Sequence, residues 1–192
     1  MIPKISSADP GKRSKVLDTV LLGFSAVPFV RWICPEAHNY LKFKDAFDAY
    51  GGGAIEKNSA YVVEGYCGAA LWLPPNVDAD EDRFIEEIEK NVSTEKHEPL
   101  FKILEELENY HPSESCWYLP IIAVDPSYQN KGIGSLLMKH ALEIVDSEGL
   151  PAYLESSNPR NMSLYQRYGF ETMGQIQVGD SPPLHPMIRT AK

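Results

Sequence analysis

The chain has 192 residues and carries 27 acidic against 18 basic residues, so its net charge is −9, while 43% of its residues are hydrophobic. This length and composition are typical of one globular domain over residues 1–192, and they exclude collagen-like, low-complexity and disulfide-stabilised chains. The acidic balance argues against a nucleic-acid-binding protein, which needs a basic face to displace counterions from phosphate.

The first half of the chain is predicted to form helices and one β-hairpin. Apolar residues at helical spacing indicate a helix over residues 11–23 and a second over residues 37–50, which the three glycines at 51–53 should end. Aromatic and β-branched residues then predict strands over residues 59–64 and 68–73, joined by a short turn.

The middle of the chain combines an acidic helical region with a strongly apolar strand. In residues 84–108 the glutamates fall on the face opposite the apolar residues, and an amphipathic helical region over a core accounts for them without any function. Residues 117–124 are an almost continuous apolar run, which predicts a central strand buried on both faces.

The last third is the most regular part of the sequence. The pattern predicts a helix over residues 132–147, a strand over 152–156, a short helix over 162–168 and closing strands over 170–178 and 185–189. A strand, a helix and a further strand within about 40 residues imply a parallel crossover. The chain is therefore predicted to be mixed α/β.

The cysteines and the N-terminal region suggest where the protein resides. Cys34, Cys67 and Cys116 form no CxxC pair and fit free thiols in a reducing cytosol, so we expect a cytoplasmic protein. The apolar residues 20–30 follow basic ones, as in a signal peptide, but Pro28 interrupts them and no cleavage site follows. This stretch is also too short to cross a membrane. The histidines lack metal-ligand spacing, so no metal is expected.

A glycine-containing loop between the central strand and the next helix carries the clearest chemical signal. Its residues are Gln129, Asn130, Lys131, Gly132, Ile133, Gly134 and Ser135. Gly132 and Gly134 lack a Cβ, so phosphate oxygens can approach the backbone N–H groups at the positive end of the helix dipole. Lys131 can add charge and Ser135 a hydroxyl. The Walker pattern is absent and Leu137 replaces the third Rossmann glycine, which leaves a plain strand-to-helix turn as the alternative.

Two blocks of the sequence together resemble a known family. The segment QNKGIG, after the strand end Val-Asp-Pro, resembles motif A of the GNAT superfamily of N-acetyltransferases, whose loop cradles the pyrophosphate of coenzyme A. The segment NMSLYQRYGF, with Asn161, Tyr165, Gly169 and Phe170, is similar to a second family block. The resemblance covers about residues 117–176. It implies the GNAT-like acyl-CoA N-acyltransferase fold, a mixed, largely antiparallel sheet with one splayed parallel strand pair, flanked by helices.

The resemblance also implies a binding mode for acetyl-CoA. The coenzyme is expected between the separated ends of the strands at 119–124 and 152–156, with the backbone of Ile122, Ala123 and Val124 along the pantetheine arm. The loop from Gln129 to Ser135 is expected to hold the pyrophosphate. Asn161 would hydrogen-bond the pantetheine or cap the short helix, since asparagine is a good helix cap.

The same resemblance also implies which residues are catalytic. Tyr165 matches the tyrosine that the family places beside the coenzyme sulfur, where a phenol can protonate the departing thiolate, although simple packing is the alternative. Glu155 is our first candidate for the general base because its strand should border the cleft. Glu64, His111 or a chain of waters are the alternatives.

We therefore expect an acetyl-CoA-dependent N-acetyltransferase that transfers an acetyl group to an amine of a small molecule, by direct attack on the thioester. The alternatives are a non-catalytic acyl-CoA-binding or sensing domain and a protein or peptide N-acetyltransferase. The expected partner is a small-molecule amine, without nucleic acid or membrane, and a homodimer is left open.

Overall fold

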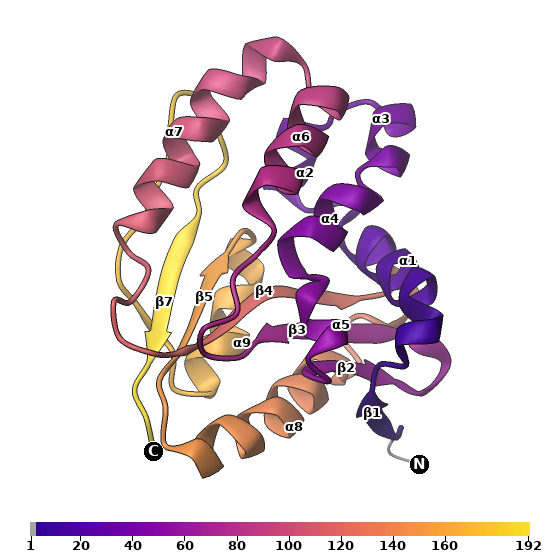
Figure 1. Cartoon of the computed structure of the whole chain (residues 1–192), viewed down its shortest axis with the longest axis vertical. Helices are drawn as coiled ribbons and strands as arrows, with labels where there is room; N and C mark the ends of the chain where they lie inside the picture. The colour runs from indigo at the N-terminus through magenta and orange to yellow at the C-terminus, as the bar shows by residue number, and fades with distance from the viewer. Residues whose placement is uncertain (1–2) are drawn as a thin grey trace.

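A seven-stranded sheet forms the centre of the structure (Figure 1). The computed structural model describes residues 3–192. The strands lie in the order β1-β2-β3-β4-β5-β7-β6, and every neighbouring pair is antiparallel except β4 and β5. This is the predicted mixed sheet with one parallel pair. The strands are β1 (Ile5–Ser7), β2 (Ala60–Val63), β3 (Gly68–Leu73), β4 (Trp117–Val124), β5 (Ala152–Ser156), β6 (Glu171–Thr172) and β7 (His185–Arg189).

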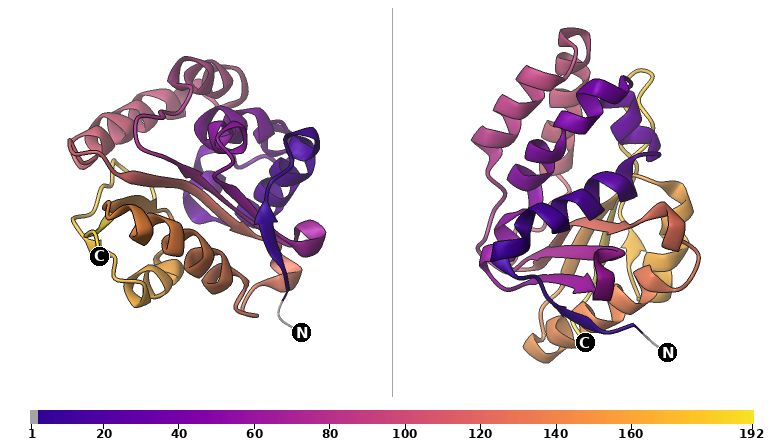
Figure 2. Two further views of the ribbon diagram at one scale, coloured as in Figure 1. Left: turned by 60° about the horizontal axis from the view of Figure 1, so that its bottom comes forward. Right: turned by 90° about the vertical axis from the view of Figure 1, so that its right-hand side faces the viewer.

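Helices cover both faces of the sheet. The helices are α1 (Arg13–Phe24), α2 (Pro28–Ile33), α3 (Ala37–Lys42), α4 (Lys44–Gly51), α5 (Gly53–Glu56), α6 (Glu81–Asn91), α7 (His97–Glu108), α8 (Ile133–Glu148) and α9 (Met162–Arg167). In the left view of Figure 2, the helices of the first hundred residues lie on one side of the strands and α8 lies on the other. Two buried apolar clusters correspond to these two layers, so the sheet has a core on each face.

The parallel strands β4 and β5 pair only over a short distance. Trp117 is opposite Ala152 and Tyr118 is opposite Tyr153, and no further residue of β4 pairs with β5. The next positions of β4 include Pro120, which has no N–H to donate, and the register of β4 against β3 also shifts here. The proline and the register shift thus lie where the two parallel strands stop pairing.

The N-terminal helices differ from the expected pattern. The predicted helix at 37–50 is interrupted at Phe43, whose buried ring packs edge-on against Phe47, and α2, beginning at Pro28, was not predicted. The glycines at 51–53 do not end helical structure, since α5 begins at Gly53. Gly51 instead allows close packing, because a Cβ there would lie 2.8 Å from Cδ1 of Ile121.

Other differences concern the acidic region and two strands. Residues 84–108 belong to two separate helices, α6 and α7, and the strand expected at 170–178 is reduced to β6 and one bridge between Ile176 and Leu184. Gly174 lies directly against the Tyr110 ring, where a wider side chain has no room. Residues along β4 alternate between buried and half-buried, instead of being buried throughout, because cavities lie along this strand.

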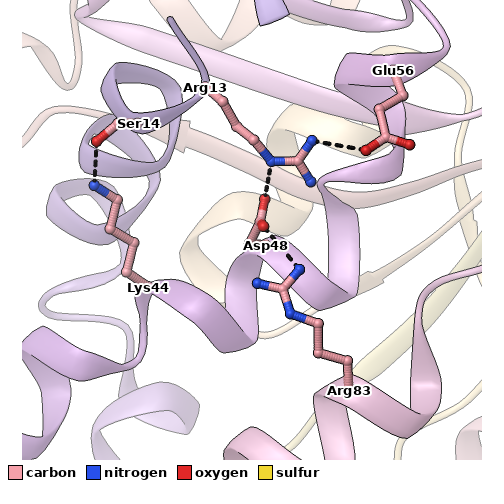
Figure 3. A network of polar contacts seen from close by, with 6 residues as sticks. All are labelled: Arg13, Ser14, Lys44, Asp48, Glu56 and Arg83. Carbon is pink, nitrogen blue, oxygen red and sulfur yellow. Dashed lines mark hydrogen bonds and ion pairs between the residues drawn. The ribbon is translucent and has the colours of Figure 1, made fainter. Parts of the chain in front are cut away.

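An ion-pair network fixes the N-terminal helices relative to one another (Figure 3). Asp48 on α4, only 8% exposed, accepts a hydrogen bond of 2.7 Å from Arg13 on α1 and one of 3.0 Å from Arg83 on α6. Arg13 also pairs with Glu56 at 3.1 Å. Asp48 therefore links three helices, and it lies two residues before Tyr50, which belongs to the site described next.

Candidate active site

A cavity of about 500 Å³ lies where β4 and β5 stop pairing. We call it the coenzyme cavity. Its walls come from β4, the loop before α8, the end of β5, α9 and the last residues of α1. The predicted site residues that line it are Ile122, Ala123, Val124, Gln129, Asn130, Gly132, Ile133, Gly134, Ser135, Glu155, Asn161 and Tyr165. The structure thus brings the two sequence blocks, together with Glu155, to one cavity.

The loop before α8 is shaped as an anion site. Asn130 and Gly132 have φ angles of 59° and 81°, and a Cβ on Gly132 would meet no atom within 4 Å. In the described part of the chain the N–H groups of residues 130–132 donate to no acceptor. The first N–H groups of α8 have no earlier turn to bond to, and the helix dipole is positive at this end. Gln129 donates to the Val124 carbonyl at 3.1 Å and so fastens the loop to β4. These features fit a pyrophosphate.

Lys131 is the predicted coenzyme-binding residue that does not line this cavity. Its ammonium donates to the Ser127 carbonyl at 2.8 Å and lies 5.1 Å from the centre of the Tyr128 ring. Positive charge at the cavity wall comes instead from Arg160 and Arg167, at the two ends of the segment that includes α9. Arg167 is not among the residues that define either sequence block, so the motifs alone do not find it.

The end of α1 contributes wall residues that no motif indicates. Gly23, Phe24 and Val27 line the coenzyme cavity, about 100 residues before the loop they face. A Cβ on Gly23 would lie 2.8 Å from Cβ of Ala123, so a glycine is needed for α1 to lie this close to β4. The sequence signal is therefore one glycine within an otherwise ordinary helix.

Tyr165 and Asn161 lie in the wall formed by α9. The Tyr165 side chain is buried, and burial raises the pKa of its phenol. The nearby Asn161 side chain lowers this pKa by a smaller amount. The phenol is therefore protonated at neutral pH and is available as a proton donor. Asn161 is the N-cap residue of α9 but makes no side-chain capping hydrogen bond, so its amide is available to the cavity.

A second, larger cavity of about 830 Å³ lies on the other side of Glu155, and we call it the acceptor cavity. Tyr50, Phe84, His111 and Tyr118 line it together with Glu155. Six carboxylates belong to its wall: Asp78, Glu81, Glu105, Glu108, Glu114 and Glu155. Among the residues the structure describes, no lysine or arginine lines this cavity, and none of the six carboxylates forms an ion pair. The cavity therefore favours a cation.

The candidate bases occupy different places. His111 is exposed at the acceptor cavity, whereas Glu64 is exposed in the turn between β2 and β3 and lines none of the cavities described in this section. Tyr118 faces the acceptor cavity, while its neighbour Trp117 points to the opposite face of the sheet and donates to Glu148 at 2.7 Å. Of the expected carboxylates, Glu155 alone is brought to the site.

Glu155 lies at the junction of the two cavities. A small chamber of about 100 Å³, which we call the junction chamber, shares Phe24, Pro120 and Glu155 with the coenzyme cavity and Tyr50, Phe84 and Glu155 with the acceptor cavity. Its other walls are mostly apolar. Burial raises the pKa of Glu155 to about 7, even though a hydrogen bond from the Tyr118 hydroxyl, 2.7 Å long, opposes this effect.

Three further properties concern the whole of residues 3–192. No group of three or more histidine, cysteine, aspartate or glutamate side chains in this range is arranged to hold a metal ion. No helix there combines the length and the apolar character that crossing a membrane requires. Cys34, Cys67 and Cys116 are all buried free thiols.

Comparisons with known proteins agree with this geometry. Residues 99–170 match the sequence model of the acetyltransferase (GNAT) family. An uncharacterized N-acetyltransferase of Schizosaccharomyces pombe is 37% identical over 79 residues, which are 40% of this chain and 32% of that protein. A peptidyl-lysine N-acetyltransferase of Salmonella typhimurium is 27% identical over 71 residues, 37% of this chain and 48% of that protein. The matches thus span less than half the length of these curated relatives.

Solved structures match over the full length. A Corynebacterium glutamicum structure described as histone acetyltransferase HPA2 and related acetyltransferase has a TM-score of 0.71 and 25% identity, covering 100% of this chain and 98% of that one. Arylalkylamine N-acetyltransferase 2 of Aedes aegypti has a TM-score of 0.70 at 15% identity and covers 100% of both chains, which is a likeness of fold. Residues 99–170 therefore have the sequence pattern of the acetyltransferase (GNAT) family, and the whole chain has the fold of these acetyltransferase structures.

Proposed function

We propose that this chain is an acetyl-CoA-dependent N-acetyltransferase whose acceptor is an amine of a small molecule. The observation that carries the proposal is the position of Glu155, a carboxylate with a pKa of about 7 that borders the coenzyme cavity, the acceptor cavity and the chamber between them. An amine and a thioester that enter from opposite sides meet at this residue.

The residues of the chain supply the proton transfers. The bound coenzyme supplies an activated acetyl group. An alkyl amine has a pKa of about 10 and arrives as a cation, so Glu155 takes the proton that must be lost before attack. Backbone N–H groups of β4, past the point where pairing with β5 ends, are donors for the oxyanion. Tyr165 then gives its proton to the departing thiolate as the C–S bond breaks, and the second proton that the attacking nitrogen loses on forming the amide restores the phenol. Direct transfer leaves no acyl-enzyme.

The acceptor cavity supports a small cationic amine. Its carboxylates and its lack of lysine or arginine attract a positive charge, and the net charge of −9 acts in the same direction. Phe84, Tyr50 and Tyr118 add aromatic surface for an organic body. At about 830 Å³ the cavity has the volume of a small-molecule site.

A peptide lysine is the second candidate, because one relative is named as a peptidyl-lysine N-acetyltransferase. The test is a competition in which the protein, acetyl-CoA, a mixture of diamines and arylalkylamines, and a lysine-containing peptide are incubated together and the products are weighed by mass spectrometry. Acetylated small amines with unmodified peptide are expected. Acetylated peptide with unmodified amines would overturn the small-molecule assignment and leave the transferase assignment intact.

A further inference from the structure

Two tyrosines form a hydrogen-bonded chain that ends on Glu155. The Tyr118 hydroxyl donates to Oε2 of Glu155 over 2.7 Å, and the hydroxyl oxygens of Tyr50 and Tyr118 lie 2.6 Å apart. Tyr50 belongs to α4, Tyr118 to β4 and Glu155 to β5. Segments that are far apart in the sequence thus meet at one carboxylate.

The number of protons on each hydroxyl determines which tyrosine donates and which accepts in these hydrogen bonds. A phenol carries a single proton, and Tyr118 uses its proton on Glu155. In the contact between the two hydroxyls, Tyr50 must therefore be the donor and Tyr118 the acceptor. The Tyr153 hydroxyl is close enough to Glu155 to lower its pKa, but this hydroxyl is buried without a partner at hydrogen-bond distance. Among the hydrogen bonds of residues 3–192, Glu155 thus accepts from a side chain at Oε2, and Oε1 stays available.

Aromatic packing limits the movement of both tyrosines. The Tyr50 ring lies 5.0 Å from that of Phe84 and meets the Tyr118 ring edge-on at 6.4 Å. The Tyr118 ring lies 5.3 Å from that of His111 and 5.8 Å from that of Tyr153. Both tyrosines line the acceptor cavity, and neither lines the coenzyme cavity.

We propose that Tyr118 and Tyr50 are positioning residues for acetyl transfer: Tyr118 engages Oε2 of Glu155, Tyr50 holds Tyr118 in that orientation, and Oε1 is thereby left as the oxygen that accepts the proton of the acceptor amine. This inference rests on the proposed function, in which Glu155 is the base. The hydrogen bond from Tyr118 also favours the ionised carboxylate, and donation from Tyr50 strengthens it because linked hydrogen bonds polarise one another.

The test is the pH dependence of kcat at saturating concentrations of both substrates, for Tyr118→Phe and Tyr50→Phe. Loss of the Tyr118 hydroxyl is expected to move the acid limb to higher pH by about one unit, and loss of the Tyr50 hydroxyl by a few tenths of a unit in the same direction. The KM for acetyl-CoA is expected to stay unchanged, because neither side chain lines the coenzyme cavity.

Tyr40→Phe is the matched control. The Tyr40 hydroxyl is also buried and donates to the Leu21 carbonyl, but the residue lines none of the cavities described above. It is expected to lower stability and leave the acid limb in place. The other titratable groups facing Glu155 are unchanged in all variants: Glu81 on α6, His111 after α7, Cys116 before β4 and Tyr153 on β5.

The outcomes distinguish the positioning role of the two tyrosines from the role of Glu155 as the base. An acid limb that does not move in Tyr118→Phe, while Glu155→Gln is inactive, would overturn the positioning role and leave Glu155 as the base. Full activity of Glu155→Gln would overturn the base itself. A rise in the KM for acetyl-CoA that matches the loss of kcat in both tyrosine variants would indicate a general structural defect, and would also overturn the positioning role.

Discussion

Glu155 on β5 and Tyr165 on α9 line the same cavity and differ in how readily they release a proton at neutral pH. Burial raises the pKa of Glu155 to about 7, so this carboxylate both accepts and releases a proton near neutrality. Burial also raises the pKa of Tyr165, which keeps that phenol protonated. One group is thus prepared to act as a base and the other as an acid.

The activity should depend on pH through Glu155. A base must be ionised, so kcat is expected to rise as pH increases through about 7 and to level off above that value. The measurement is kcat from pH 5 to 9 with saturating substrates. A profile that is flat below pH 8, in a protein that stays folded, would contradict this role.

Tyr165→Phe should reduce the rate of the chemical step. The substitution keeps the buried ring and removes the proton donor, so we expect kcat to fall about 100-fold while the KM for acetyl-CoA changes little. Tyr61→Phe is the control, because Tyr61 is buried in the same apolar cluster but lines none of the cavities of the site. Equal losses in the two variants would mean that Tyr165 has only a packing role.

Glu155→Gln should stabilise the protein above neutral pH. The pKa of Glu155 in the folded state is raised to about 7 from an ordinary value of 4.5, so the folded form binds a proton more tightly than the unfolded form. The wild type therefore loses stability as pH rises from about 4.5 to 7. The variant should gain on the order of 2 kcal/mol above pH 7 and little at pH 4.5, as urea denaturation at each pH would measure. A difference that does not vary with pH would refute the assigned shift.

Gly132→Ala should weaken coenzyme binding specifically. Gly132 and Gly65 have φ angles of 81° and 80°, and a Cβ added to either would meet no atom within 4 Å, so alanine introduces the same backbone strain at both sites. Each variant is expected to lose about 1 kcal/mol of stability. Only Gly132→Ala should also raise the Kd for acetyl-CoA, by about 10-fold, because its Cβ would project where phosphates must approach. Equal Kd values for acetyl-CoA in the two variants, measured by calorimetry, would contradict a role of this loop in coenzyme binding.

Asp48→Ala should destabilise the helices that carry Tyr50. The buried carboxylate of Asp48 forms ion pairs with two arginines, Arg13 and Arg83, which are themselves partly exposed. We therefore expect the free energy of unfolding to fall by about 2 kcal/mol. Asp18→Ala is the control, since Asp18 pairs with Lys44 at 2.6 Å but is 59% exposed and should cost less than about 1 kcal/mol. Denaturation of the two variants compares these values directly. Similar losses would contradict the central role assigned to Asp48.

The parts of the site that come from local sequence were predictable. A glycine loop between a strand and a helix shows its chemistry in a few consecutive residues, and Gln129 and Gly132 lie at the cavity as expected. Tyr50 and Phe84 were not found, because they reach the acceptor cavity from α4 and α6 only through tertiary packing. The sequence pattern also could not predict where the Lys131 side chain points, because a long flexible side chain can turn to a nearby carbonyl.

The same distinction applies to the fold. The composition of residues 117–124 and 152–156 predicts strands by itself, and the structure has strands with these bounds. The interruption at Phe43 has no signal in the local pattern, and the close approach of Gly51 to Ile121 is a tertiary contact that the local pattern cannot show. Contacts between distant segments are thus the part of the fold that the sequence pattern does not show.

The most direct test compares the wild type with Glu155→Gln at pH 7.5, measuring acetyl-CoA binding by thermal melting and amine-dependent release of the coenzyme thiol in the same samples. At about 100 times the Kd, acetyl-CoA should raise the melting temperature of both proteins by roughly 5–10 °C. Only the wild type should release thiol when an amine is added. No melting shift in the wild type, or equal thiol release by both proteins, would contradict the assignment of an acetyltransferase that uses Glu155 as its base.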